Sequence, residues 1–131
     1  NALYNINLSQ SALLIELASR LLVSGQLEIL LARRRKGLIL RNQLTDKVLS
    51  RYEIWGNSTS LNRWLCLPHG ITGAQFEHLA YEHGVLVYGS ERFTVGKDAP
   101  AGAIRLAICA PDNMKELEQG LMILDELLNA L

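Results

Sequence analysis

The stretch Gly84-Val-Leu-Val-Tyr-Gly-Ser-Glu-Arg-Phe93, followed after a loop by Ala103-Ile-Arg-Leu-Ala-Ile-Cys109, decides how this chain folds. Two short apolar runs flank a loop with glycine and proline, which predicts strands at residues 85–87 and 104–109. The loop at 90–102 would allow the two strands to pair as antiparallel neighbours. The second run carries one charge, Arg105, and a guanidinium buried among apolar residues needs an anion to meet it.

Apolar residues at helical spacing predict two helices at the start of the chain. Ser9 is the expected N-cap of the first helix, and Gly25 is expected to end it. A second helix starts near Gln26 and runs toward Ser50. It crosses Gly37, which weakens a helix by about 1 kcal/mol relative to alanine. Contacts outside the helix must therefore hold this segment.

Strand and helix signals alternate in the rest of the chain. Residues 61–67 are expected to form a strand, and Thr72 and Gln75 match a capping box for a third helix. Gly84 suits the left-handed position that ends this helix. The residues that it is expected to bury are Phe76, Leu79 and Ala80.

The last helix has the clearest apolar stripe in the sequence. Its cap is Asp112 or Asn113, and the stripe consists of Met114, Leu117, Leu121, Leu124, Leu128 and Leu131. The complete order is two helices, strand, helix, two strands and helix. This order predicts an α+β fold, a small mixed sheet packed by helices and preceded by a long helix. The strand–helix–strand unit is expected to be parallel and right-handed.

The composition is that of a globular protein, and the net charge gives no reason to expect a polyanionic partner. The 131 residues suffice for one domain, and 49% are hydrophobic and 20% charged. Thirteen Lys and Arg residues balance thirteen Asp and Glu residues, so net charge does not indicate nucleic acid as a partner of this chain. The chain begins at Asn1 rather than methionine, which leaves open that it is a piece of something longer.

The cysteines and the absence of a long apolar run indicate a cytoplasmic protein. Cys66 and Cys109 are far apart, each in a predicted strand, and are expected to be small buried residues in a reducing compartment. No apolar run is long enough to span a bilayer, and no signal peptide opens the chain, so no membrane partner is expected.

Arg105 is the residue with the most informative surroundings, and two interpretations remain open. From strand alternation alone, it faces solvent or pairs with a carboxylate within the domain. Alternatively, it is held on a rigid strand to bind a carboxylate or phosphate through two parallel hydrogen bonds.

Other polar groups predict no catalytic or metal site. His69, His78 and His83 lack ligand spacing. The basic run at 33–36 is better explained as a solvated helix face or a contact with a neighbouring domain than as a nucleic-acid site. Nucleotide and nucleophile-elbow motifs are missing. None of the four lysines, Lys36, Lys47, Lys97 and Lys115, lies in a setting typical of a lysine that forms a Schiff base.

The two opening stretches resemble the C-terminal part of class I/II aminotransferases of the aspartate aminotransferase fold. Their pattern is G-V-x-V-x-P-G-x-x-F followed by an I-R-L strand. This chain matches the first pattern at Gly84, Val85, Val87 and Phe93 and the second at Ile104-Arg-Leu106, and it has Gly89 and Ser90 where the pattern has its proline and glycine. In that family the arginine of the I-R-L strand binds the α-carboxylate of the amino-acid substrate, so the resemblance assigns this role to Arg105.

The leading helices are similar to the MocR subgroup, in which a GntR-type winged-helix DNA-binding domain is fused to an aminotransferase-like domain. The residues in register with the subgroup's helix pattern are Gly25, Leu27, Leu31, Arg33, Arg35 and Arg41. The chain departs from it at Leu30, Arg34 and Leu38. The segment 61–68 resembles the subgroup's L-H-x-W-L-x-L-P strand, with Leu61, Trp64, Leu65, Leu67 and Pro68 kept.

The resemblance implies a C-terminal fragment of a pyridoxal-phosphate-binding transcriptional regulator. Residues 1–25 would be a linker and first helix from the end of the large domain, and 26–131 the small domain after an interdomain helix. Pyridoxal phosphate and its lysine would belong to the missing large domain, so we expect no cofactor on this fragment and no catalysis by it. DNA would be bound only through a missing N-terminal domain, and self-association as a homodimer or larger species is expected.

Two other hypotheses remain open. The chain could be the small domain of a genuine aminotransferase that lacks a DNA-binding domain. It could also be a freestanding α+β module that binds a ligand or another protein.

Overall fold

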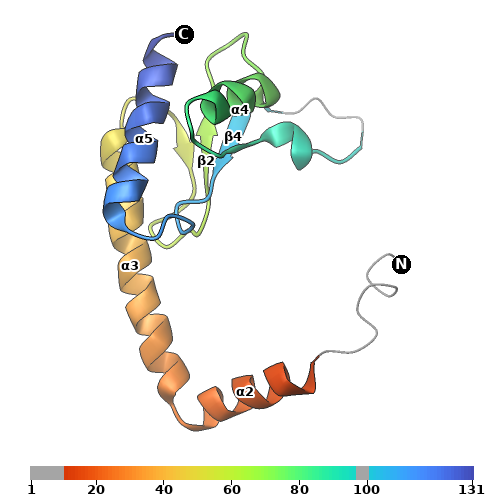
Figure 1. Ribbon diagram of the computed structural model, residues 1–131, viewed down its shortest axis with the longest axis vertical. Helices are drawn as coiled ribbons and strands as arrows, with labels where there is room; N and C mark the ends of the chain where they lie inside the picture. Colours follow the sequence, from red (N-terminus) through yellow and green to blue (C-terminus); the bar gives the residue numbers. More distant parts are fainter. Residues whose placement is uncertain (1–10, 97–100) are drawn as a thin grey trace. The chain divides into compact units, whose positions relative to one another are not determined.

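The computed structural model describes residues 11–96 and 101–131 (Figure 1). Contacts divide the chain into two compact units, Asn1–Lys36 and Gly37–Leu131. The elements of the described residues, in chain order, are α2 (Ala12–Val23), α3 (Gln26–Val48), β1 (Ile54–Trp55), β2 (Arg63–Cys66), α4 (Gly73–Glu82), β3 (Tyr88–Gly89), the short 3-10 helix η1 (Ser90–Arg92), β4 (Ala103–Leu106) and α5 (Met114–Asn129). The predicted α+β class is confirmed.

The first unit contains α2 and the beginning of α3. α2 starts after Ser11 and ends at Ser24, and Gly25 follows with a φ of 71° in the left-handed region, as predicted. Ser9, the expected cap, lies outside the described residues. No residue of α2 is buried. The predicted second helix is confirmed, because α3 continues through Gly37 into the second unit.

The second unit is built on a four-stranded sheet with the order β1-β2-β4-β3. All three pairings are antiparallel, which corrects the expected mixed sheet. β2 and β3 run in the same direction, but β4 lies between them and is antiparallel to both. The antiparallel pairing of the two strands joined by the 90–102 loop is confirmed.

The strands differ from expectation in their boundaries and in one addition. The strand expected at 85–87 is β3 at Tyr88–Gly89, because the Val85 N–H instead donates to Ala80 O (2.9 Å) at the end of α4. β4 ends at Leu106, and a turn closed by the Ala110 N–H on Ala107 O places Cys109 outside the sheet. The sequence did not predict β1, because two residues are too few to show a strand pattern.

The helices predicted from sequence as α4 and α5 are largely confirmed. Thr72 and Gln75 form the complete capping box of α4, and Gly84 follows the helix with a φ of 80°. Asn113 caps α5 by accepting a hydrogen bond from the Glu116 N–H (2.9 Å). The ends of the predicted α5 stripe, Met114 and Leu131, are exposed, and Leu127 joins the buried middle instead.

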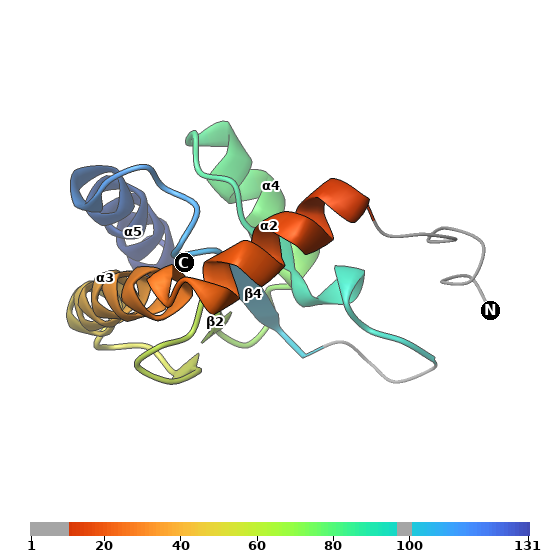
Figure 2. The same cartoon turned by 90° about the horizontal axis from the view of Figure 1, so that it is seen from below.

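The core lies between the sheet and the helices α4 and α5. Leu65 and Ile104 are register partners on neighbouring strands and are completely buried, as is Phe76 of α4. The end of α3 runs beside α5 (Figures 1 and 2), and Arg51, just beyond α3, contacts Asp125 of α5 at 3.0 Å. No helix in the described part of the chain has the length and apolar character needed to cross a membrane.

Candidate functional site

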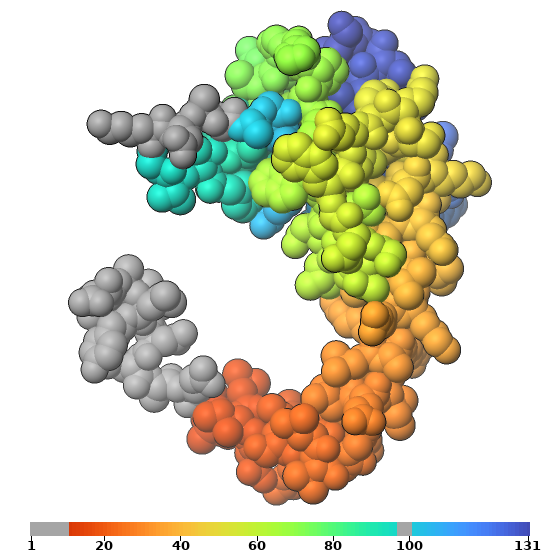
Figure 3. Space-filling model, turned by 180° about the vertical axis from the view of Figure 1, so that it is seen from behind, coloured from red at the N-terminus to blue at the C-terminus, as the bar shows by residue number. Residues whose placement is uncertain are grey.

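Arg105 lies within β4, one of the two central strands of the sheet. Its register partners are Trp64 on β2 and Tyr88 on β3, and Trp64 is also paired with Trp55 on β1. Directly opposed residues of antiparallel strands project to the same face. A row of aromatic side chains with one arginine therefore crosses the face opposite to the buried Leu65–Ile104 pair. In the view of Figure 3, from behind, the yellow-to-green segment that contains β1 and β2 lies at the surface.

Aromatic rings surround the guanidinium of Arg105. Its Cζ atom lies 4.6 Å from the ring centroid of Phe93 and 5.4 Å from that of Tyr88. Phe93 in turn meets Trp64 edge-on, with centroids 5.3 Å apart and an interplanar angle of 89°. Both ring–guanidinium distances are within the range of about 6 Å for cation–π attraction. The rings thus restrict the arginine without neutralising it.

Arg105 has no anionic partner in the part of the chain that the structure describes. No Asp or Glu of this part forms an ion pair with it. Its Nε atom is buried and makes no hydrogen bond with the described residues. A buried guanidinium donor without an acceptor is unfavourable. The half-buried Arg105 is therefore neither ion-paired within this part of the chain nor fully solvated.

An open hollow of about 210 Å³ adjoins the same aromatic residues. It is lined by Trp55, Trp64, Ser90, Phe93, Thr94, Ala101 and Ala103. Apart from two hydroxyl groups and the indole N–H groups of the two tryptophans, the side chains of this lining are apolar. The aromatic face therefore combines apolar contact area with the guanidinium of Arg105.

Glu77 of α4 braces the edge of this site. Its carboxylate accepts hydrogen bonds from the Gly89 N–H (2.8 Å) and from Arg92, with Nε 3.1 Å from Oε1. The hydrogen bond from Arg92 is the main reason that the pKa of Glu77 lies below its ordinary value. Conversely, the pKa of Arg92 is raised, chiefly by its hydrogen bond to Glu77.

Arg63 is more deeply buried than Arg105, and its function is structural. Its Nη2 lies 2.8 Å from Asp46 Oδ1 and its Nη1 2.9 Å from Asn42 Oδ1, both on α3. Its Nε donates to Trp55 O (3.2 Å). The sequence held a signal for this contact, since Arg63 is in phase with the buried Leu65 of its strand. All three nitrogens have acceptors, unlike Nε of Arg105.

Arg41 also has a structural role that sequence analysis missed. Its Nη1 and Nη2 each lie 2.9 Å from a carbonyl oxygen, that of Ile108 and that of Pro111 respectively. These carbonyls belong to the turn between β4 and α5. Arg41 therefore fastens α3 to that turn, and no short-range sequence pattern could reveal partners so distant along the chain.

The remaining candidate groups do not gather into a second site. The basic run 33–36 is exposed, as are Lys36, Lys47 and Lys115, while Lys97 lies outside the described residues. Among the described residues, no three His, Cys, Asp or Glu side chains are placed to hold a metal ion. Both cysteines are free and half-buried rather than buried as expected, and burial raises the pKa of the Cys66 thiol.

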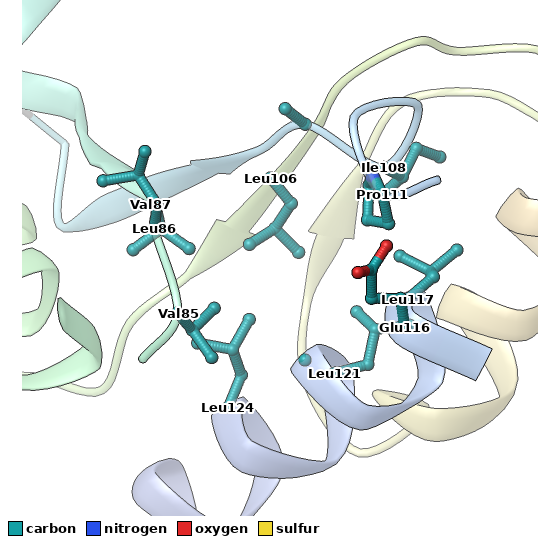
Figure 4. A pocket seen from close by; sticks show the side chains of 12 residues that line it. Val85, Leu86, Val87, Leu106, Ile108, Pro111, Glu116, Leu117, Leu121 and Leu124 are labelled. Atoms are coloured by element: carbon teal, nitrogen blue, oxygen red, sulfur yellow. The ribbon is translucent and has the colours of Figure 1, made fainter. Parts of the chain in front are cut away.

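An apolar hollow of about 80 Å³ lies between residues 85–87, the end of β4 and α5 (Figure 4). Leu106 and Leu124 project into it from opposite sides, and Glu116 is the one charged residue in its lining. Leu106 follows Arg105 directly in β4, so the two side chains point to opposite faces. This hollow is a packing gap of the core and is separate from the arginine site.

Comparisons with known proteins agree with the sequence motifs. The chain is 48% identical over 130 residues to the HTH-type transcriptional regulator YdeF of Bacillus subtilis. The match covers 99% of this chain and 28% of that regulator, so the chain spans little more than a quarter of its length. No protein-family model matches the chain.

Two solved structures share the fold. One, from Psychrobacter arcticum and assigned as an amino-acid aminotransferase, has a TM-score of 0.71 and 19% identity over 98% of this chain and 32% of its own. The other is an archaeal alanine:glyoxylate aminotransferase, with a TM-score of 0.61 and 22% identity over 75% of this chain and 24% of its own. As the motifs predicted, the chain has the fold of part of an aminotransferase chain and resembles part of a transcriptional regulator in sequence.

Proposed function

We propose that this chain is the small, C-terminal domain of a MocR-type, GntR-family regulator and that Arg105 receives the carboxylate of an amino-acid ligand. Residues 1–25 would be the linker and helix from the end of the large domain, and 26–131 the small domain. The sequence match to an HTH-type regulator and the aminotransferase fold support the proposal. In the whole protein, ligand binding at Arg105 would bias a DNA-binding domain elsewhere, as a coupling between two sites.

One observation carries the assignment of Arg105. Its guanidinium is held among aromatic rings on a rigid strand, with a buried Nε that has no acceptor among the described residues. An arginine that only stabilised the domain would be expected to resemble Arg63, whose three nitrogens all have acceptors. A ligand carboxylate would provide the missing charge through two parallel hydrogen bonds from the guanidinium.

Acetate is a minimal probe for this role. In ¹⁵N-labelled protein at constant ionic strength, acetate should shift the Nε–Hε resonance of Arg105 in a saturable manner. The Arg63 signal serves as an internal control and should not move, because its nitrogens are occupied. The resonance is assigned by its loss in Arg105→Gln. No acetate-dependent shift of the Arg105 signal would overturn the proposed role.

We propose that pyridoxal phosphate is bound in the whole protein by residues outside this chain. A lysine that forms an imine needs a dry pocket that depresses its pKa. Lys36, Lys47 and Lys115 are exposed and do not fit the group. We therefore assign no step of pyridoxal chemistry to these residues. Borohydride reduction after mixing with pyridoxal phosphate should trap no stoichiometric adduct, and one adduct per chain would contradict the assignment.

The whole protein is proposed to be cytoplasmic and to bind DNA through a winged-helix domain. The sequence likeness to an HTH-type regulator supports this. The fold likeness to aminotransferases supports a second candidate, the small domain of a genuine aminotransferase. The coding sequence upstream of Asn1 separates them, since it either encodes a winged helix or does not.

A further inference from the structure

We propose that Tyr88 is a positioning residue for Arg105, and that the ion pair of Arg92 with Glu77 holds the Tyr88 ring in place. The proposal rests on the carboxylate-binding role proposed above for Arg105. It assigns a purpose to a residue at a position that the aminotransferase pattern leaves variable.

The register of the sheet places Tyr88 directly beside Arg105. The two residues are Cα partners on β3 and β4, so their side chains leave the same face of the sheet as immediate neighbours. The Cζ atom of Arg105 lies 5.4 Å from the Tyr88 ring centroid. Because Phe93 contacts the same guanidinium at 4.6 Å, two rings limit its movement. An aliphatic side chain has no aromatic face and could not provide this contact.

A second arginine connects the Tyr88 ring to helix α4. The Cζ atom of Arg92 lies 5.3 Å from the ring centroid of Tyr88. Arg92 is bound through Nε and Nη2 to Glu77, at 3.0 Å from Oε2 and 2.5 Å from Oε1 respectively. The same carboxylate accepts the N–H of Gly89, the residue after Tyr88. Glu77 thus fixes both the backbone next to Tyr88 and the cation on its ring.

This arrangement explains how the site restricts the conformation of the Arg105 side chain before an anion binds. An arginine side chain that moves freely must lose several rotamers when it binds. A guanidinium already restricted by aromatic faces loses fewer, so a carboxylate should bind it more tightly. Removing the ring of Tyr88 should therefore weaken carboxylate binding even though Tyr88 itself need not touch the ligand.

The test compares Tyr88→Phe with Tyr88→Leu in the 131-residue chain, with acetate as the probe. Tyr88→Phe keeps the ring and should bind acetate as the unchanged protein does. Tyr88→Leu should bind about threefold more weakly, which corresponds to a cation–π contact at a partly exposed site. Its Arg105 Nε–Hε signal should also lose its ring-current shift and become more mobile in ¹⁵N relaxation. Tyr81→Leu, at an exposed tyrosine of α4, is the matched control and should change neither measurement.

Glu77→Gln provides a second, independent variant. It keeps Tyr88 but removes the charge that holds Arg92, so the mobility of the Arg105 Nε should rise less than in Tyr88→Leu. If Tyr88→Leu leaves both Nε mobility and acetate affinity unchanged, the positioning proposal is overturned, while loss of the response in Arg105→Gln would still support carboxylate binding. If acetate fails to shift Arg105 in the unchanged protein, the proposed function fails, and Nε mobility alone then decides the role of Tyr88.

Discussion

At the scale of single residues, the buried Arg63 should contribute far more to stability than an exposed arginine with a similar ion pair. Arg63→Met leaves the acceptors of Asn42 and Trp55 without a donor, so the free energy of unfolding should fall by about 3 kcal/mol. Arg51→Met breaks the more exposed ion pair with Asp125, so the free energy of unfolding should change by less than about 1 kcal/mol. Urea unfolding measures both, and equal losses would contradict this account.

The pKa of Glu77 predicts a loss of stability in acid. Because Arg92 holds this pKa below the ordinary carboxyl value of 4.5, the folded state favours the ionised form. The resulting stabilisation is complete above that value and disappears as the pH falls through the lowered pKa of the folded state. Glu77→Gln cannot titrate. The difference in urea midpoint between the unchanged protein and this variant should therefore shrink from neutral to acid pH, and a constant difference would refute the linkage.

Sequence reasoning located Arg105 but not its surroundings. An arginine within an apolar strand is visible from sequence, and so is the placement of Arg63 on the same side of its strand as Leu65. The acceptors of Arg63 on α3 and those of Arg41 near α5 are distant along the chain. Tertiary contacts therefore decide which arginine has hydrogen-bond acceptors for all of its nitrogens and which does not. The aromatic row across the sheet likewise follows from strand register, which the pattern of single strands does not determine.

At the scale of elements, the close approach of α4 to the sheet depends on a glycine. A Cβ at Gly73 would lie 2.7 Å from Ala103 O and 2.8 Å from the Cα of Gly89, both in strands. Gly73→Ala should therefore push α4 away and lower the free energy of unfolding by about 2 kcal/mol. Gly120→Ala within α5 meets nothing within 4 Å and should raise it by about 0.5 kcal/mol or more. Thermal unfolding of both variants tests the pair, and destabilisation by both would contradict it.

The α4 cap offers a second measurement on the same element. The Thr72 side chain accepts the Gln75 N–H (3.2 Å), and the Gln75 side chain accepts the Thr72 N–H (3.0 Å). Thr72→Ala should lower the free energy of unfolding by about 1 kcal/mol, and Thr72→Ser should restore most of it. Urea unfolding would show this order. A serine variant as unstable as the alanine variant would indicate that the cap hydrogen bond is not the cause.

Helices were predictable where local chemistry determines them, and strands were less so. The capping box, the left-handed glycines and the α5 stripe are signals within a few residues of each other. The two-residue β1 and β3 are strands only because β2 and β4 pair with them. Val85 and Val87 have strand propensity. However, the Val85 N–H donates to a carbonyl at the end of α4, and the Val87 side chain is buried in the core. Tertiary contacts here override propensity.

At the scale of the whole molecule, the first unit should cause self-association. Large apolar side chains are exposed on it, including Leu13 at 77%, Leu17 at 53% and Leu31 at 57%. Exposed apolar surface of this kind favours association. In light scattering, the mass of the unchanged chain should increase with concentration, whereas the triple variant Leu13→Gln, Leu17→Gln, Leu31→Gln should remain a monomer. Leu86→Gln, at an exposed position in the second unit, is the control, and a monomeric unchanged chain would refute the prediction.

The position of β4 in the sheet has a consequence for the order of events during synthesis. β4 is the last strand to be made, yet it is the one that joins β2 to β3. A nascent chain ending at residue 96 contains β1, β2 and β3 without the strand that connects them. The sheet must therefore wait for the segment that carries Arg105. For the same reason, residues 1–96 and 101–131 expressed as separate polypeptides should acquire structure only when mixed, as two halves of a complementing pair.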